Sequence, residues 1–150
     1  MHPLGEILNN HVLLISLAAS LIAQASKFFT VALQSKPWQW QALFETGGMP
    51  SAHSALVSAL AVGIGRTQGW DSPLFAIATV FAVIVMYDAM GIRRAAGKQA
   101  QVLNQIVFEV FTRDRAGEID PLKELLGHTP IQVLVGSLLG ITLMWCFLPA

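Results

Sequence analysis

Four long apolar segments dominate this chain of 150 residues, at positions 12–33, 51–67, 73–90 and 131–148. A helix that crosses a bilayer needs roughly 20 mainly apolar residues, and each segment approaches that length. Charged residues make up 12% of the sequence, roughly half their share in a soluble domain, so little polar sequence remains to cover four apolar helices in water. We expect an all-α fold: a single domain over residues 1–150, built as an integral-membrane bundle of about four transmembrane helices.

Two alternatives concern individual segments. The segments at 51–67 and 73–90 also have the composition of buried helices in a soluble bundle. The first segment contains Ala23-Gln24-Ala25, which resembles the cleavage site of a signal peptide. Residues 1–11 hold no Lys or Arg, however, and a signal peptide has a basic leader. We therefore expect a retained helix.

Residues 99–111 predict a helix of a different kind, because apolar residues recur on one helical face and polar residues on the other. Such an amphipathic helix lies along the membrane interface or packs on the bundle. Further along, Asp120 and Pro121 are typical of a helix start and Gly127 of a helix end, so a short helix is predicted between them. The apolar stripe of the longer helix consists of Val102, Leu103, Ile106, Val107 and Val110.

The basic residues are divided unequally between the two sides that four crossings would define. Eight of the nine Lys and Arg residues fall within 27–50 and 91–127, and the other side has Arg66 alone. Basic loops stay in the cytoplasm, so the two long connections are expected there and both termini on the opposite side.

Composition also restricts partners and cofactors. The formal net charge is zero, which argues against nucleic acid as a partner and leaves membrane lipid as the expected one. Cys146 is the only cysteine, so the chain has neither a disulfide framework nor a cysteine-based metal site. We expect no metal and no cofactor, and the sequence leaves the oligomeric state open.

Two of the predicted helix starts carry a histidine. Residues 47–55 read Gly-Gly-Met-Pro-Ser-Ala-His-Ser-Ala, and residues 127–130 read Gly-His-Thr-Pro. A helix N-terminus has unpaired N–H groups and a partial positive charge, which suit a bound oxyanion such as phosphate. Imidazole titrates near neutral pH and can act as a nucleophile or a general acid. His53 and His128 therefore indicate phosphoryl chemistry at a membrane surface.

Three blocks of the sequence resemble a known family. Residues 50–53, Pro-Ser-Ala-His, resemble the Pro-Ser-Gly-His element of the type 2 phosphatidic acid phosphatase superfamily, which also contains vanadium-dependent haloperoxidases. His128 and the stretch 133–140 resemble its closing element, a His followed at the fourth place by Asp and then by a Val-Leu-x-Gly-x-x-x-Gly helix. Residues 47–55, 87–100 and 126–130 together are similar to the small divergent bacterial and plastid branch of that superfamily, and these motifs cover nearly all of 38–148.

The resemblance implies a phosphohydrolase that cleaves a phosphate monoester, expected to be lipid-linked, through a phosphohistidine. His128 would attack phosphorus, and His53 would protonate the leaving alkoxide. Backbone N–H groups and cationic side chains would neutralise the charge that develops on the phosphoryl oxygens. Asp88 and Gln132 would support these groups. The expected phosphate-binding residues are Arg93, Arg94, Ser51, Gly48 and Lys27.

The resemblance also implies a place in the cell, a bacterial inner membrane or a plastid-type membrane. The distribution of basic residues puts the expected active site at the cytoplasmic face. The chain departs from the superfamily pattern at three positions. Gln132 stands where the pattern has an acid, and an amide can accept the ring N–H but cannot stabilise an imidazolium as a carboxylate does. Leu122 stands where the pattern has an Arg, six residues before the nucleophile. Lys27 is not followed by the Arg-Pro pair of the pattern's first element.

Other functions and plainer structural roles fit the same residues. One alternative is a non-catalytic membrane protein that keeps an anion site for a phospholipid headgroup. Another is a haloperoxidase, for which vanadate would be the cofactor. Ser51 and Thr129 also fit plain helix N-caps, and Arg94 and Lys98 fit topology determinants that face anionic headgroups. The glycines at 63, 65, 136 and 140 are expected to permit close helix packing and not to bind a ligand.

Overall fold

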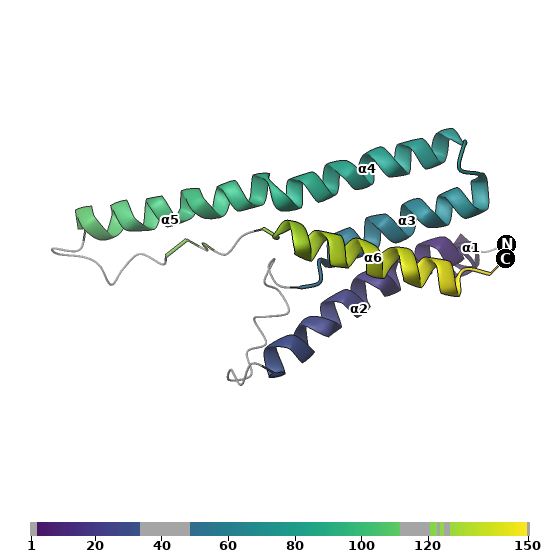
Figure 1. Cartoon of the computed structure of the whole chain (residues 1–150), viewed down its shortest axis with the longest axis horizontal. Helices are drawn as coiled ribbons and strands as arrows, with labels where there is room; N and C mark the ends of the chain where they lie inside the picture. The colour runs from purple at the N-terminus through teal and green to yellow at the C-terminus, as the bar shows by residue number, and fades with distance from the viewer. Residues whose placement is uncertain (1–2, 34–48, 112–120, 123, 125–126, 150) are drawn as a thin grey trace.

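The computed structural model describes residues 3–33, 49–111, 121–122, 124 and 127–149, and in these residues all regular structure is helical (Figure 1). The four apolar segments predicted from the sequence correspond to α2, α3, α4 and α6. A short helix, α1, was not predicted. The helices are α1 (Pro3–Leu8), α2 (His11–Leu33), α3 (Ala52–Gln68), α4 (Pro73–Met90), α5 (Ile92–Phe111) and α6 (Pro130–Phe147).

Three of these helices begin at a hydroxyl side chain that caps the first turn. Ser51 Oγ accepts from the backbone N–H of Ser54 at the start of α3, and Ser72 does the same for α4. Thr129 caps α6, whose first residue is a proline. A cap supplies an acceptor to an N–H group that has no partner inside the helix, which is why the helix begins there.

Two helical stretches are long and apolar enough to cross a membrane, Pro73–Val110, in which α4 runs on into α5, and Pro130–Phe147. In α2 the apolar part is shorter, His11–Lys27, and α3 has 17 residues. By length and composition the structure thus supports two spans, and the prediction of four is not confirmed for the other two helices.

Helix α3 lies at the centre and packs against α2, α4 and α6 (Figure 1). Its contact with α6 is a backbone contact, because the Ser51 N–H donates to the Gln132 carbonyl at 3.0 Å. A Cβ on Gly136 would overlap the Ser51 carbonyl oxygen, and a Cβ on Gly140 would overlap that of Ala55. The expected close packing at these glycines is confirmed, and it draws the two helix N-termini together.

The packed interior consists mainly of small side chains, and large apolar side chains point outward. Among the buried residues are Ala19, Ala55 and Ala59, each with no exposed surface, together with Ser54. On α4 and α6 many large aliphatic and aromatic residues are more than one-third exposed, whereas Val133 and Met144 of α6 are buried. The exposed ones include Ile77, Val80, Ile84, Ile131, Leu134 and Leu138.

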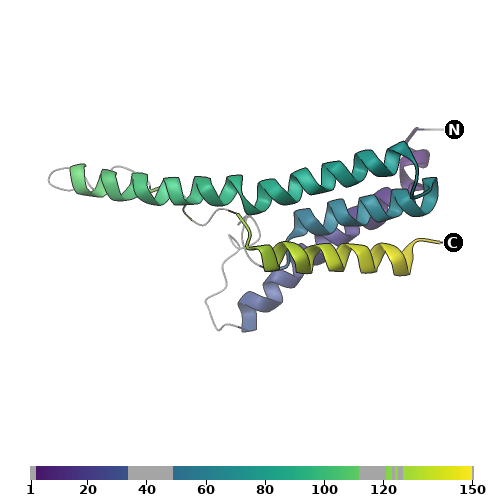
Figure 2. The same ribbon diagram turned by 45° about the horizontal axis from the view of Figure 1, so that its top comes forward.

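Helix α5 differs from its prediction in start and position. It begins at Ile92, directly after Gly91, and continues the direction of α4 beyond the end of the bundle (Figures 1 and 2). Among the helices it contacts only α4, so the alternative that it packs on the bundle is wrong. Its apolar stripe is largely exposed, with exposed fractions of 57% at Val102 and 65% at Val110.

The predicted short helix before Gly127 is also wrong for the residues that the structure describes there. Pro121, Leu122 and Glu124 are not helical. The side-chain amide of Asn104 on α5 bonds to both the N–H and the C=O of Leu122, each within 2.9 Å. A helix of so few residues gains too few internal bonds to compete with such side-chain partners.

Both termini lie at one end of the bundle (Figure 1). The first turns of α3 and α6 and the junction between α4 and α5 lie at the other end (Figures 1 and 2). The bundle therefore gathers the histidine-bearing helix starts and the basic start of α5 in one region.

Candidate functional site

His53 and His128, which are 75 positions apart in sequence, lie side by side. Their ring centroids are 6.4 Å apart and the ring planes are tilted by 58°. His53 is the second residue of α3 and is exposed, whereas His128 precedes the cap of α6 and has only 2% of its surface exposed. The contact between α3 and α6 thus produces a pair of imidazoles, one accessible and one buried.

The backbone of His128 is fixed at the junction of α4 and α5. Its N–H donates to the Ala89 carbonyl at 2.9 Å. The preceding Gly127 has φ of +91°, and a Cβ there would lie 2.7 Å from the Arg94 backbone nitrogen. Glycine is required at this position for both reasons, since other residues rarely adopt this φ and the space is closed.

The ring of His128 is oriented by Gln132. Its Nδ1 lies 3.3 Å from Gln132 Oε1, and the same oxygen accepts from the Thr129 N–H at 3.0 Å. Thr129 Oγ1 in turn accepts from the Gln132 N–H, which completes a capping box. An oxygen acceptor at Nδ1 favours the tautomer whose proton is on Nδ1, in which the ring lone pair is on Nε2.

Arg93 is associated with the His53 side of the site. Its Nε donates to Asp88 Oδ2 at 2.8 Å, and both side chains are partly exposed. The positive charges of Arg93 and Lys27 and the negative charge of Asp88 all act on the His53 imidazole. Lys27 is 6% exposed and lies in the second half of the long helix α2. Three of the residues predicted from sequence are thus close enough to act electrostatically on His53.

Arg94 does not share the surroundings of Arg93 and lines a separate cavity. This cavity, of about 210 Å³, is also lined by Lys98 and Gln101 of α5, and the opposite wall includes Glu124 and His128. Arg93 and Arg94 are adjacent in sequence, and neighbouring residues on a helix face different directions. The sequence left open which of them binds phosphate, and the structure places them on different sides of the site.

Ser51 is completely buried and serves as the N-cap of α3. Its Oγ accepts from the backbone N–H of Ser54 at 3.3 Å and pairs with Ser54 Oγ at 2.9 Å. The structural alternative for Ser51, a helix N-cap, is thus observed. Gly48, the other predicted ligand of this segment, lies outside the described residues.

Three groups at the site were not singled out from the sequence. The Ala89 carbonyl holds His128, Asn104 holds the segment before it, and Gln101 lines the cavity. The contact of a main-chain carbonyl cannot be predicted from residue types. The one available signal for the cavity was the spacing of Arg94 and Lys98, because residues four apart share a helical face.

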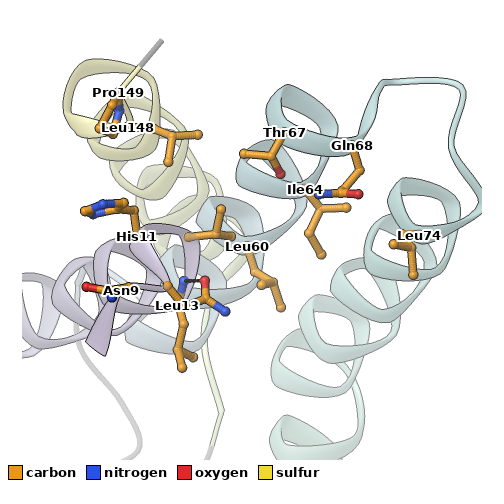
Figure 3. A pocket seen from close by; sticks show the side chains of 12 residues that line it. Asn9, His11, Leu13, Leu60, Ile64, Thr67, Gln68, Leu74, Leu148 and Pro149 are labelled. Atoms are coloured by element: carbon orange, nitrogen blue, oxygen red, sulfur yellow. Dashed lines mark hydrogen bonds between the residues drawn. The ribbon is translucent and has the colours of Figure 1, made fainter. Parts of the chain in front are cut away.

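A larger cavity, about 640 Å³, lies at the opposite end of the bundle (Figure 3). Side chains of α2, α3 and α4 and the residues after α6 form its walls, and His11 is among them. His53 and His128 are absent from its lining. No group of three His, Cys, Asp or Glu side chains within the described residues could hold a metal ion.

Comparison with known proteins supports the resemblance seen in the sequence. The chain is 47% identical over 148 residues to the uncharacterized membrane protein YuiD of Bacillus subtilis, a match that covers 92% of this chain and 94% of that protein. No solved structure matches the chain significantly. The model of the divergent PAP2 family matches residues 8–143. The chain therefore belongs to the divergent PAP2 family.

Proposed function

We propose that this protein is an integral-membrane phosphohydrolase that cleaves a lipid-linked phosphate monoester through a phosphohistidine. The distribution of side chains supports the membrane location. The interior is formed mainly by alanine, serine and glycine, and many large apolar residues are exposed on the outside of α4 and α6. Small residues at helix contacts and large apolar residues facing outward are typical of helices packed in lipid. The similar protein of Bacillus subtilis is itself named a membrane protein.

In this proposal α2, α3, α4 and α6 all cross the membrane. The common end of the two termini supports an even number of crossings (Figure 1). Eight of the nine basic residues fall within 27–50 and 91–127 of the sequence, and basic loops favour the cytoplasmic side. The proposal therefore has the histidine pair at the cytoplasmic face. A substrate with a buried tail and an exposed phosphate suits a polar site at the end of an apolar bundle.

The chemistry follows from the roles that the two histidines can take. His128 Nε2 attacks phosphorus, a P–N bond forms, and the bond from phosphorus to the alkoxide oxygen breaks. His53 gives its proton to that oxygen. Water then attacks the phosphohistidine, His53 takes a proton from it, and inorganic phosphate leaves from a regenerated His128. Arg93 and the backbone N–H groups at the start of α3 stabilise the charge on the transferring group.

The single observation that carries this proposal is the 6.4 Å separation of the His53 and His128 rings. At this separation one phosphoryl group can contact both imidazoles. The contact of the Nδ1 of His128 with Gln132 also supports a nucleophilic Nε2.

The test is release of phosphate from a long-chain alkyl monophosphate by purified protein in detergent. We expect His128→Ala to abolish release and His53→Ala to lower it about 10²- to 10⁴-fold, the usual range for loss of a general acid. His11→Ala, at the far end of the bundle, is the matched control and should leave the rate unchanged. Vanadate should inhibit. Release that persists in His128→Ala would refute the mechanism.

The second candidate is a non-catalytic protein that binds a phospholipid headgroup at the same site. The observation that favours it is Gln132, an amide where the superfamily pattern has an acid. In that case the wild-type protein releases no phosphate but binds vesicles that contain phosphatidic acid, and Arg93→Gln weakens the binding. Bromination that depends on vanadate and peroxide would instead assign haloperoxidase chemistry.

A further inference from the structure

Helix α5 carries a line of residues with the spacing of a coiled-coil seam. These residues lie alternately four and three positions apart, a pattern that repeats every seven residues and keeps them on one side of a helix. The large ones are well exposed, from 49% at Leu103 and Ile106 to 65% at Val110. In order, this seam consists of Ile92, Ala96, Gln99, Leu103, Ile106 and Val110.

The rest of α5 is suited to water and not to lipid. The exposed residues of α4 are almost all apolar, as expected of a helix in a membrane, whereas most exposed residues of α5 outside the seam and its neighbour Val102 are polar. A helix with one apolar side and a polar remainder is amphipathic, and in water its apolar side is stabilised by a partner that covers it. The exposed polar residues outside the seam are Arg94, Lys98, Gln101, Gln105 and Glu109.

The segment before His128 contacts a different side of α5 and holds the helix in line with α4. Leu122 is bonded to Asn104 of α5, and the His128 N–H donates to the Ala89 carbonyl of α4. As a result α5 continues the direction of α4 (Figures 1 and 2). An amphipathic helix that binds lipid lies flat in the membrane interface. To do so, α5 would have to bend at its junction with α4 and break these contacts.

The membrane determines how two copies of the chain can meet. In the proposed function α4 crosses the membrane, and all copies insert with the same orientation because the same loop charges decide it. Their α5 helices then project from the same face of the membrane and point in the same direction. From Ile92 to Val110 the seam is about 27 Å long, at a rise of ~1.5 Å per residue. Two seams can therefore pair in parallel along most of the helix.

The single polar residue of the seam supports pairing between identical chains. In a symmetric parallel pair each residue faces its own counterpart across the axis, so Gln99 faces Gln99. An amide both donates and accepts hydrogen bonds, so two copies of this side chain can bond to each other. One polar residue in an otherwise apolar seam is a known way to specify the register of a coiled coil.

We propose that the seam of α5 is a self-association surface, through which two copies of this chain form a parallel coiled coil outside the membrane. The inference rests on the proposed crossing of α4 and not on the proposed chemistry. Both copies are held in one membrane with their helices already aligned. The pairing therefore does not have to overcome the full entropic cost of association between free helices.

The test is disulfide cross-linking in native membranes, with a single cysteine placed on α5 in a Cys146→Ser background. A disulfide requires two Cα atoms within roughly 7 Å, which identical seam positions of a parallel pair satisfy. We expect Ile92→Cys and Ile106→Cys each to give a covalent dimer, twice the mass of the chain, under mild oxidation. Gln105→Cys is exposed on another side of the same helix, so it is the matched control and should remain monomeric.

A second pair of variants tests the contact itself. Leu103→Lys places two like charges across the axis of the pair, so it should abolish the cross-link at Ile106→Cys. Gln105→Lys adds the same charge outside the seam and should retain that cross-link. Both positions are exposed, so neither substitution disturbs a packed interior.

Absence of covalent dimers at both seam positions would overturn the proposal. Equal cross-linking at Gln105→Cys would do the same, because random collision would then explain the dimers. Cross-linking at Ile106→Cys alone would exclude the parallel arrangement, since Ile92 lies about 21 Å away along the helix.

The lipid surface is the competing partner, and the same chain tests it. A fluorophore attached at Leu103→Cys in vesicles should not be quenched by lipids that carry a nitroxide group. Quenching would show that α5 lies on the membrane and would overturn the coiled coil. The two proposals of this article also fail separately. Seam-specific cross-links in a protein that releases no phosphate refute the enzyme alone, and phosphate release without cross-links refutes the coiled coil alone.

Discussion

At the scale of single residues, Gln132 has two structural roles. Its backbone and side chain complete the capping box of α6, and its Oε1 also contacts Nδ1 of His128. An amide in this place fixes the ring orientation without supplying a negative charge. The start of α6 and the orientation of the proposed nucleophile thus depend on one side chain.

We expect Gln132→Glu to accelerate the proposed reaction. Glutamate has the same length, so it can keep the capping box, and its charge favours the imidazolium that develops as Nε2 bonds to phosphorus. The difference between a neutral and a charge-assisted hydrogen bond corresponds to roughly a tenfold increase in kcat. Because the charge stabilises the protonated ring, the acidic limb of the pH–rate profile should move to higher pH.

The measurement is kcat as a function of pH for the wild-type and variant proteins. Gln132→Leu serves as the control, since it removes both the cap and the contact with His128, and its rate should fall. A folded Gln132→Glu protein that is slower than the wild type at every pH would contradict this role of Gln132.

At the scale of helices, the contact between α3 and α6 determines the site. Gly136 and Gly140 lie against the backbone of α3, so no side chain separates the two helices there. The first turns of both helices meet as a result, and each brings its histidine. The geometry of the site is therefore a property of helix packing.

Gly140→Ala should destabilise the protein by about 1–3 kcal/mol, the usual cost of extra volume in a packed interior. The reason is that the new Cβ would overlap the Ala55 carbonyl, which belongs to a helix backbone and cannot turn aside. Thermal unfolding in detergent, followed by circular dichroism, measures the change. Gly5→Ala is the matched control, because no atom lies within 4 Å of a Cβ there. Equal midpoints for both variants would contradict the packing argument.

Much of this element structure could be predicted from the sequence. The apolar segments gave α4 with both ends correct, because Pro73 and Gly91 bound it and its one charged residue, Asp88, lies near its end. The start of α5 could not be predicted, because residues 92–98 are basic and lack an apolar stripe. The non-helical conformation of Leu122 depends on Asn104, eighteen positions away, and such a tertiary contact leaves no local pattern.

Some features of the candidate site could likewise be predicted from the sequence, and others could not. His53 and His128 could be paired in advance because each follows a glycine-containing turn at a helix start. The separate directions of Arg93 and Arg94 could not be read from the sequence, because they depend on how α5 follows α4. The support from Ala89 is a main-chain contact and is independent of side-chain identity.

At the scale of the whole molecule, the proposed orientation makes opposite predictions for the two ends of the bundle. Gln68 is exposed at the end of α3 that lies near the termini, and Gln105 is exposed on α5. In a Cys146→Ser background, we expect Gln68→Cys to react with a membrane-impermeant maleimide in intact cells. Gln105→Cys should react only after the membrane is opened. The reverse pattern would place the histidine pair outside the cytoplasm.

The residues before and at His128 connect α4 to α5 across their junction. The His128 N–H donates to the Ala89 carbonyl of α4, Gly127 lies against Arg94 at the start of α5, and Leu122 is bonded to Asn104 further along α5. A change in the angle between the two helices must therefore break one of these contacts or move His128. Any force that bends the projecting helix would be transmitted to the imidazole that the proposed reaction uses.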